Sequence, residues 1–460
     1  MILIAESGGT VVKSQGHLGN AGLMQITATI FATMVAATLL IPQQTAPPLP
    51  EKYLSAGMRH QDLPPIIHIV LDEFIGVEGI PTDIDGGKDL KEELKSFYLD
   101  KGFHVFGKAF SSFYHTHDSM SHLLNPSESY ARGLTKPGGK RVDYELIRSE
   151  YFSRLEERGY IFNINQLSHS NYCNAVKTRL AKCRTARANT AKLLQNLPVS
   201  WPGKFRVLAR LYFSQSLIWR AIRAMYRRIS AMISSAWLPL PIWQWERPLA
   251  GPLSAFESVD FPEKDLRTAS RGEYHFAHML TPHSPHVYDR NCEVDEPSEW
   301  TWRRIPEGLS KLSNTPEIRR HRYKRYFEQV RCLQKRIAGL LAFIDRSSDL
   351  KDAVLILHGD HGSRITLWEP RSSNKERLVQ SDYVDGYSTL FAIRGPGLPA
   401  GYDMRLISIQ GLFGYFMENG FTSLPGTAYH TGEPTILLHG GAGRDIVPMV
   451  DFGDTGVGGG

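Results

Sequence analysis

Residues 352–362 read DAVLILHGDHG, and this stretch decides the fold that the sequence predicts. The short apolar run Ala353–Leu357 is typical of a buried strand in a parallel sheet. It leads into His358-Gly359-Asp360-His361-Gly362, in which Asp360 and His361 offer one oxygen and one nitrogen ligand and the two glycines let the main chain turn sharply around an ion. Since ligands gather at the carboxyl ends of strands in open α/β sheets, we expect a metal site here. The structural alternative is a turn that needs no ion.

Strand and helix signals alternate from Pro64 onward, which predicts an α/β fold with a largely parallel sheet. The other expected strands are Ile66–Leu71, Phe103–Phe110, Tyr160–Ile164, Tyr274–Leu280 and Thr389–Ile393. The expected helices, which carry apolar residues at a spacing of three and four, are Lys88–Leu99, Tyr144–Arg158 and Ile318–Ile344.

The composition is that of a folded, mildly basic protein. The chain has 460 residues, of which 42% are hydrophobic and 22% charged, so it buries a sizeable core and is not disordered throughout. The net charge of +6 favours anionic substrates or lipid head groups, and it is too diffuse to indicate binding to nucleic acid.

The four cysteines form no CxxC pair, so the sequence does not indicate a zinc ribbon. Their even number allows two disulfides. Cys173 and Cys183 are near enough in sequence to close one loop, and Cys292 with Cys332 would tie a loop to a helix. The alternative is that all four are reduced, buried thiols.

The N-terminal region lacks charge between Lys13 and Glu51, and Leu23–Ile41 is long enough for a bilayer span of about 20 residues. We therefore expect residues 1–50 to form a membrane anchor or signal segment followed by a Pro-rich tether. A cleaved signal and a buried helix are the alternatives. This order suits a catalytic domain, residues 51–440, held outside the cytoplasmic membrane (the periplasm) by a single anchor, with secretion as the second choice. Residues 441–460 are expected to be a tail.

A basic insertion interrupts the alternation of strands and helices. Phe205–Trp237 carries arginines among Leu, Ile, Trp and Tyr and contains no acid. A basic helix with aromatic flanks suits a membrane surface. The alternative is a helix packed on the domain whose arginines face water.

Two further strand ends carry chemistry. The strand Ile66–Leu71 is followed by Asp72, which is well placed for a metal, although Asp after a strand is also ordinary turn chemistry. The loop after the strand Tyr274–Leu280 holds His283 between two prolines, so its imidazole is positioned to contact a substrate oxyanion or ligate a metal. His278, inside the strand, is expected to be a core histidine or to lie behind the ligands.

Thr116 precedes the helical stretch HDSMSHLL. Its hydroxyl either caps the helix or, beside the free N–H groups and positive dipole end of that helix, serves as a nucleophile. Ser119, one turn on, is the competing nucleophile or a supporting donor. We assign no ligand role to the nearby His115, His117 or His122.

The set Asp72, Thr116, His283 and Asp360-His361 resembles the alkaline phosphatase/sulfatase superfamily. It is most similar to the bacterial membrane-anchored branch that includes lipoteichoic acid synthases and phosphoglycerol or phosphoethanolamine transferases. The resemblance covers roughly residues 64–420, through LDE, T-x-x-S, PH-x-P and DHG. It implies a three-layer αβα sandwich and a divalent metal (Mn, Zn, Mg or Ca) bound by Asp72, Thr116, Asp360 and His361, with His283 as the oxyanion contact. The stretch YKRYFEQVRC resembles a helix of this family, with which a Cys292–Cys332 disulfide agrees.

Two departures from the family pattern limit the resemblance, one in the reaction and one in the number of membrane spans. The turn at Thr116 lacks the Cys or Ser followed by x-Pro-x-Arg of formylglycine sulfatases, so a sulfatase in the strict sense is not expected. The transferases carry several membrane spans before the catalytic domain, whereas this chain offers at most one.

The sequence therefore predicts a metal-dependent hydrolase or transferase of phosphate or sulfate esters. Thr116 would attack the ester in line, with His283 balancing charge on the oxygens. The expected substrate is an ester that is lipid-linked or part of an envelope glycan, a small soluble ester being the rival. The alternative from another class is a non-catalytic relative that binds an anion or glycan in envelope assembly.

Overall fold

The computed structural model describes residues 62–128, 130, 133–138, 143–167, 169–186, 200–202, 204, 266–295, 315–429, 432–440 and 445–452. The predicted anchor and tether (1–50) and the basic insertion (205–237) lie outside these residues. No helix in the described part of the chain has the length and apolar character needed to cross a bilayer.

An eight-stranded sheet forms the centre of the fold, in the order β12-β2-β11-β10-β1-β9-β6-β8. Strand β11 is antiparallel to both of its neighbours, and the other pairings are parallel. In this order the strands span Gly401–Asp403, His104–Phe106, Phe391–Arg394, Val354–Gly359, Ile66–Leu71, Glu273–Met279, Ile161–Leu167 and Leu180–Ala186. The central strands β1, β9 and β10 are buried along their whole length, as expected for a parallel sheet covered on both faces.

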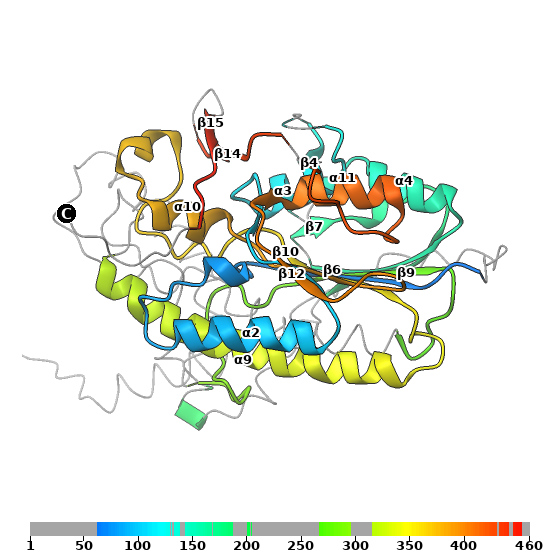
Figure 1. Ribbon diagram of the computed structural model, residues 1–460, viewed down its shortest axis with the longest axis horizontal. Coiled ribbons are helices and arrows are strands. Elements are labelled where there is room, and N and C mark those ends of the chain that lie inside the picture. The colour runs from blue at the N-terminus through cyan, green and yellow to red at the C-terminus, as the bar shows by residue number, and fades with distance from the viewer. Residues whose placement is uncertain are drawn as a thin grey trace, which may run out of the picture. The chain divides into compact units, whose positions relative to one another are not determined.

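Helices cover both faces of this sheet (Figure 1). On one face lie α2 (Gly87–Asp100) and α9 (Pro316–Arg346), and on the other lie α3 (Thr116–Leu123), α4 (Glu150–Glu157) and α11 (Ile409–Asn419). A separate hydrophobic cluster fills each interface between helices and sheet. The predicted three-layer αβα sandwich with a mostly parallel sheet is therefore confirmed.

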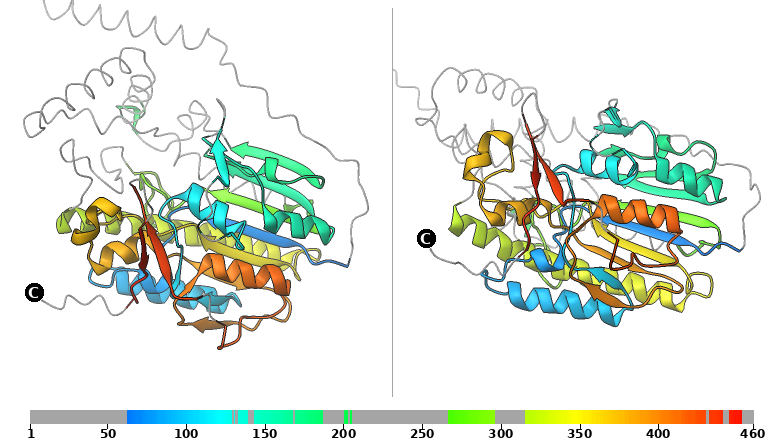
Figure 2. Two further views of the ribbon diagram at one scale, coloured as in Figure 1. Left: turned by 90° about the horizontal axis from the view of Figure 1, so that it is seen from above. Right: turned by 45° about the horizontal axis from the view of Figure 1, so that its top comes forward.

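Smaller elements complete the fold. A three-stranded sheet consists of β4 (Thr135–Pro137), β5 (Tyr144–Leu146) and β7 (Ser170–Asn171), and β3 (Ala109–Phe110) pairs with β13 (Ile407–Ser408). The hairpin of β14 (Thr435–Leu438) and β15 (Asp445–Pro448) packs against α10 (Gln380–Tyr387), as Figures 1 and 2 show. Strand β15 lies within residues 441–460, which the sequence assigned to the tail. Short 3-10 turns are η1 (Val77–Gly79), η2 (Cys173–Ala175) and η4 (Ser372–Arg377).

Two predicted elements were wrong in extent. The strand expected at Phe103–Phe110 is divided at Gly107, where an added Cβ would lie 2.6 Å from the Tyr402 hydroxyl, so the chain bends closely around that side chain. The helix expected at Tyr144–Arg158 begins only at Glu150. Ser149 caps it by accepting a hydrogen bond from Phe152 N, and Tyr144–Leu146 instead pairs in a sheet.

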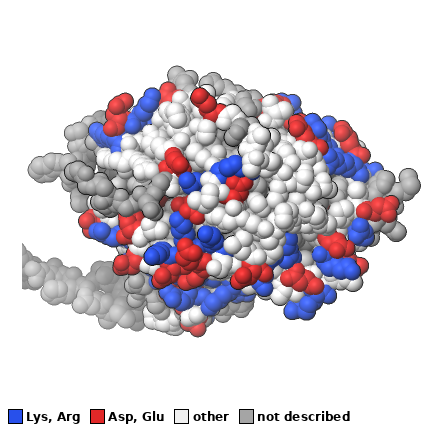
Figure 3. All heavy atoms as spheres, viewed as in Figure 1, with Lys and Arg blue, Asp and Glu red and all other residues white. Residues whose placement is uncertain are grey.

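Both disulfides form, Cys173–Cys183 and Cys292–Cys332. The first closes a loop between β6 and β8 and the second ties a loop to α9, so the alternative of four free thiols was wrong. On the face shown in Figure 3, acidic and basic side chains are interspersed. Ion pairs such as Lys324–Asp85 and Arg331–Glu93 join α9 to the segment around α2.

Candidate metal centre and active site

Three adjacent parallel strands place acidic and imidazole side chains at one edge of the sheet. Leu71, the last residue of β1, is in register with Gly359 of β10 and Met279 of β9. Asp72 and Asp360 each follow directly, and His278 lies one residue before Met279. Ligand atoms of Asp72, His278 and Asp360 all lie within 4.8 Å of one another, and all three residues are buried. The carboxyl ends of the strands therefore form a compact N/O donor cluster.

His361 presents its Nε2 atom to this cluster. The atom lies 3.0 Å from Asp360 Oδ2 and 3.8 Å from Asp72 Oδ1. The Nδ1 atom is 3.0 Å from the carbonyl oxygen of Gly362, to which it donates a hydrogen bond in the Nδ1–H tautomer. Nε2 faces the carboxylates, to which it donates when the ring is protonated, and it can give its lone pair to a metal once that proton is lost.

The hydroxyl of Thr116 lies beside His361. Its Oγ1 atom is 3.1 Å from His361 Nε2, and the side chain is buried. The helix cap predicted as the alternative role was wrong, because α3 begins at Thr116 itself and His115 occupies the N-cap position without a side-chain hydrogen bond. The hydroxyl is therefore turned toward the ligand cluster while the first N–H groups of α3 lie next to it.

Ser119 lies one turn further along α3 and has a different set of contacts. Its hydroxyl donates a 2.5 Å hydrogen bond to the main-chain carbonyl of Asp360 and lies 2.8 Å from the hydroxyl of Ser111. These bonds attach α3 to the loop that carries Asp360 and His361. Of the two roles expected for Ser119, its geometry favours the supporting donor.

His278, expected from the sequence to be a core histidine or to lie behind the ligands, instead lies in the donor cluster itself. Its Nδ1 atom lies 3.1 Å from the Tyr172 hydroxyl, and its Nε2 atom is 3.9 Å from Asp72 Oδ2. This Nε2 is buried and makes no hydrogen bond within the described part of the chain. Burial lowers the pKa of His278 to about 4, so the ring is neutral at pH 7 and can ligate. The one feature of the sequence that could have indicated this position is that His278 lies near the carboxyl end of an apolar strand.

His283 reaches Glu73. Its Nε2 atom is 3.4 Å from Glu73 Oε1, and its Nδ1 atom is 2.6 Å from the carbonyl oxygen of Ser284. The loop that holds it contains two cis peptide bonds, Thr281–Pro282 and Ser284–Pro285. The side chain is 20% exposed, so it lies where the buried cluster approaches solvent.

Glu73 and Arg364 form a buried ion pair beside the cluster, and no role was predicted for either from the sequence. Arg364 Nε and Nη2 lie 2.8 and 2.5 Å from Glu73 Oε1, and Ser284 N donates to the other carboxylate oxygen. Glu73 has a left-handed backbone (φ 63°), and its N–H donates to Asp360 Oδ1. The turn after β1 therefore joins Asp360 to the His283 loop.

The charges around Asp360 keep it ionised. Burial alone would raise its pKa, but the charge and hydrogen bond of His361, with His278 and Arg364, hold the pKa of Asp360 below its ordinary value. Arg364 shows the same balance, because burial opposes its charge while Glu73 and Asp72 raise its pKa.

The donor set fits a divalent cation. Two carboxylates, two imidazole Nε2 atoms and one hydroxyl converge from β1, β9, β10 and α3. One buried atom of the set, His278 Nε2, makes no hydrogen bond among the described residues. Buried polar atoms of this kind are costly unless something binds them, and mixed N/O sets suit transition metals.

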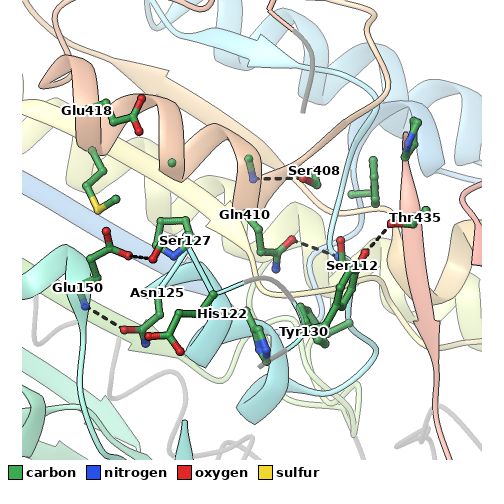
Figure 4. A pocket seen from close by; sticks show the side chains of 18 of the residues that line it. Ser112, His122, Asn125, Ser127, Tyr130, Glu150, Ser408, Gln410, Glu418 and Thr435 are labelled. Atoms are coloured by element: carbon green, nitrogen blue, oxygen red, sulfur yellow. Dashed lines mark hydrogen bonds between the residues drawn. The ribbon is translucent and has the colours of Figure 1, made fainter. Parts of the chain in front are cut away.

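A cavity of about 390 Å³ lies on another side of α3 (Figure 4). Its wall comes from the C-terminal half of α3, the following loop, α11 and β14. Gln410 of α11 lines it, accepts a hydrogen bond from Ser112 N, and lies 3.4 Å from the hydroxyl of Ser119. The wall of the cavity therefore includes Gln410, which contacts Ser119, and Ser119 in turn holds α3 to the loop of Asp360.

Comparisons with known proteins found similar solved structures but no match at the level of sequence. No family model matches the sequence, and no curated protein matches it. Solved structures that resemble it include a phosphonate monoester hydrolase from Silicibacter pomeroyi (14% identity, TM-score 0.46, 82% of this chain and 79% of that one). Also similar are a 2-O GAG sulfatase (12%, TM-score 0.44, 80% and 72%) and the C-terminal periplasmic domain of EcEptC from Escherichia coli (10%, TM-score 0.44, 86% and 96%).

Proposed function

We propose that the chain is a metal-dependent hydrolase or transferase of phosphate or sulfate esters, of the alkaline phosphatase/sulfatase superfamily, with Thr116 as its nucleophile. The observation that carries the proposal is the 3.1 Å contact between Thr116 Oγ1 and His361 Nε2, an atom that also faces both carboxylates of the cluster. A nucleophilic hydroxyl next to a carboxylate-imidazole cluster at the ends of parallel strands is an arrangement for ester transfer.

Asp72, His278, Asp360 and His361 would hold the divalent cation, with Thr116 as a further oxygen ligand. Once bound, such a cation supplies positive charge that acidifies a nearby hydroxyl and polarises an ester oxygen. The two imidazoles favour Zn²⁺ or Mn²⁺ over Mg²⁺ and Ca²⁺, which prefer oxygen ligands. His278 is added here to the set that the sequence predicted.

Three groups of the protein would act on the ester: the Thr116 hydroxyl, the N–H groups at the start of α3, and His283. Thr116 Oγ1 attacks phosphorus or sulfur in line with the leaving oxygen and becomes esterified. The N–H groups at the start of α3 stabilise the charge on the non-bridging oxygens, and His283, on the exposed side, donates to an oxygen of the substrate. Water or an acceptor alcohol then releases the group from the threonine.

Thr116→Ala tests the nucleophile. We expect turnover of a chromogenic phosphodiester to be abolished while the bound metal, measured by elemental analysis, stays close to the wild-type amount, because four other ligands remain. Ser119→Ala is the matched control on the same helix, and it should retain turnover. Activity that survives in Thr116→Ala and disappears in Ser119→Ala would assign the nucleophile to Ser119.

The alternative is a non-catalytic relative that binds an anion or glycan. It predicts no turnover of phosphate monoesters, phosphodiesters or sulfate esters by metal-loaded protein, whereas the enzyme should cleave at least one of them. The basic segment 205–237 is the part of the chain that would contact a lipid-linked substrate. Residues 1–50 are the part that would anchor the protein in a membrane. Binding of the full chain to anionic liposomes, with and without residues 205–237, tests the first of these predictions.

A further inference from the structure

The contacts of His278 lead away from the site to a tyrosine and a disulfide. Tyr172 OH lies 3.1 Å from His278 Nδ1, and it is a buried phenol that packs edge-on against the imidazole ring. His278 Nε2, on the opposite side of the ring, faces Asp72. The orientation of the ring thus depends on the Tyr172 hydroxyl, which holds its outer nitrogen.

Tyr172 is itself fixed by the loop in which it lies. Its main-chain N–H donates a 2.7 Å hydrogen bond to Gln166 Oε1 of β6, and the amide nitrogen of Gln166 also bonds Asn171 and Thr185. The next residue, Cys173, is joined by the disulfide to Cys183 of β8. The loop is therefore held to the sheet on both sides of the tyrosine.

We propose that Tyr172 is a positioning residue for the metal site: its hydroxyl fixes the ring of His278, and the Cys173–Cys183 disulfide fixes Tyr172. The proposal rests on the proposed function, because it requires His278 to be a ligand. A phenol both donates and accepts a hydrogen bond, so it can accept one from Nδ1–H when Nε2 gives its lone pair to a metal.

Calorimetric titration of metal-stripped full-length protein with Mn²⁺, and separately with Zn²⁺, measures the effect without reference to activity. Tyr172→Phe should weaken binding about 10- to 100-fold, the usual loss when the outer partner of a ligating histidine is removed. Tyr160→Phe is the matched control, because that hydroxyl bonds the carbonyl of Pro64 before the start of β1, away from the site. It should bind as the wild type does.

A double-mutant cycle separates positioning from general destabilisation. If Tyr172 acts through His278, then Tyr172→Phe combined with His278→Gln should bind no more weakly than His278→Gln alone. Additive losses would overturn the proposal. Thermal melts of each variant show whether the fold is retained.

The disulfide arm uses the two Cys pairs of the chain. Replacing Cys173 and Cys183 by Ser should weaken binding in the same direction as Tyr172→Phe, and should add nothing in the Tyr172→Phe background. Replacing Cys292 and Cys332 by Ser, which leaves Tyr172 untouched, should have no comparable effect. If the first pair of replacements prevents folding, Tyr172→Phe alone decides the question.

The outcomes also separate the two proposals. A folded wild-type protein that binds neither metal contradicts the proposed function itself. Wild-type binding with unchanged affinity in Tyr172→Phe contradicts only the positioning role, and the metal-dependent enzyme stands.

Discussion

At the residue scale, we expect a small change at Glu73 to cost more stability than a change at most other positions. It is fully buried, and its carboxylate is the partner of the equally buried Arg364. Removing one member of such a pair leaves an uncompensated charge in the interior, which costs far more than the pair itself contributes.

We therefore expect Glu73→Gln to lower the free energy of unfolding by about 3 kcal/mol, measured by urea denaturation. The control is Glu328→Gln, because Glu328 pairs with the exposed Arg290. It should cost less than about 1 kcal/mol. Equal effects of the two changes would mean that Arg364 finds another partner.

The sequence predicted part of this site and missed part of it, for physical reasons. Asp72, Asp360 and His361 directly follow apolar runs, so the rule for strand ends identified them, and Thr116 stood at the start of a helical stretch. These four lie in one cluster. His278 was missed because a histidine inside an apolar strand looks like core, and its role depends on which strand lies beside β1. The partnership of Glu73 with Arg364 joins positions far apart in the chain, and no local pattern indicates it.

At the element scale, α9 holds the turns of the site from one face of the sheet. Tyr326 OH donates to the carbonyl of Glu73 and accepts from Ile75 N. Gln329 donates to the carbonyls of Pro282 and His283 and accepts from Val287 N. The helix thus fixes both the turn after β1 and the loop that carries His283.

Gln329→Leu removes the three bonds to that loop and leaves buried main-chain groups unpaired. We expect a loss of about 2 kcal/mol in urea denaturation. Turnover of the phosphodiester by Gln329→Leu should also fall, to about the same extent as in His283→Ala. Gln380→Leu, which removes one exposed bond to the carbonyl of Asp451, is the control and should change neither quantity appreciably. Full turnover in a destabilised Gln329→Leu would show that the loop keeps its conformation without the glutamine.

The elements themselves were predictable where periodicity was long and unbroken. The helices expected at Lys88–Leu99 and Ile318–Ile344 are confirmed within two residues at each end. The helix expected from Tyr144 began six residues late because Tyr144–Leu146 finds partners in β4 and β7, and those partners come from other parts of the chain.

At the scale of the whole molecule, buried neutral histidines control stability in mild acid. Burial lowers the pKa of each of four of them, to about 4 for His278 and His358, to about 3 for His286, and well below the ordinary value for His68. In the unfolded chain these groups take up protons below about pH 6.5, while in the folded protein they do not. Stability should therefore fall as the pH falls from about 6.5 toward 4.

His286→Gln isolates one of these contributions. Each such histidine costs about 1.4 kcal/mol per pH unit over this range, so between pH 7 and pH 5 the variant should lose about 2 kcal/mol less stability than the wild type. Urea denaturation at the two pH values measures the difference. The same slope in wild type and His286→Gln would mean that His286 is already charged in the folded state.

The order in which translation delivers the proposed ligands restricts when the proposed metal site can form. They come from positions 72, 116, 278 and 360–361, so at ordinary elongation rates the ribosome releases the last of them roughly 15–60 s after the first. Strand β1 lies between β9 and β10, and it has neither neighbour until most of the polypeptide has been made. A nascent chain therefore carries an apolar strand without its partner strands and only part of the proposed binding site. We expect chaperones to bind such a chain, and we expect ion binding to be one of the last steps of maturation.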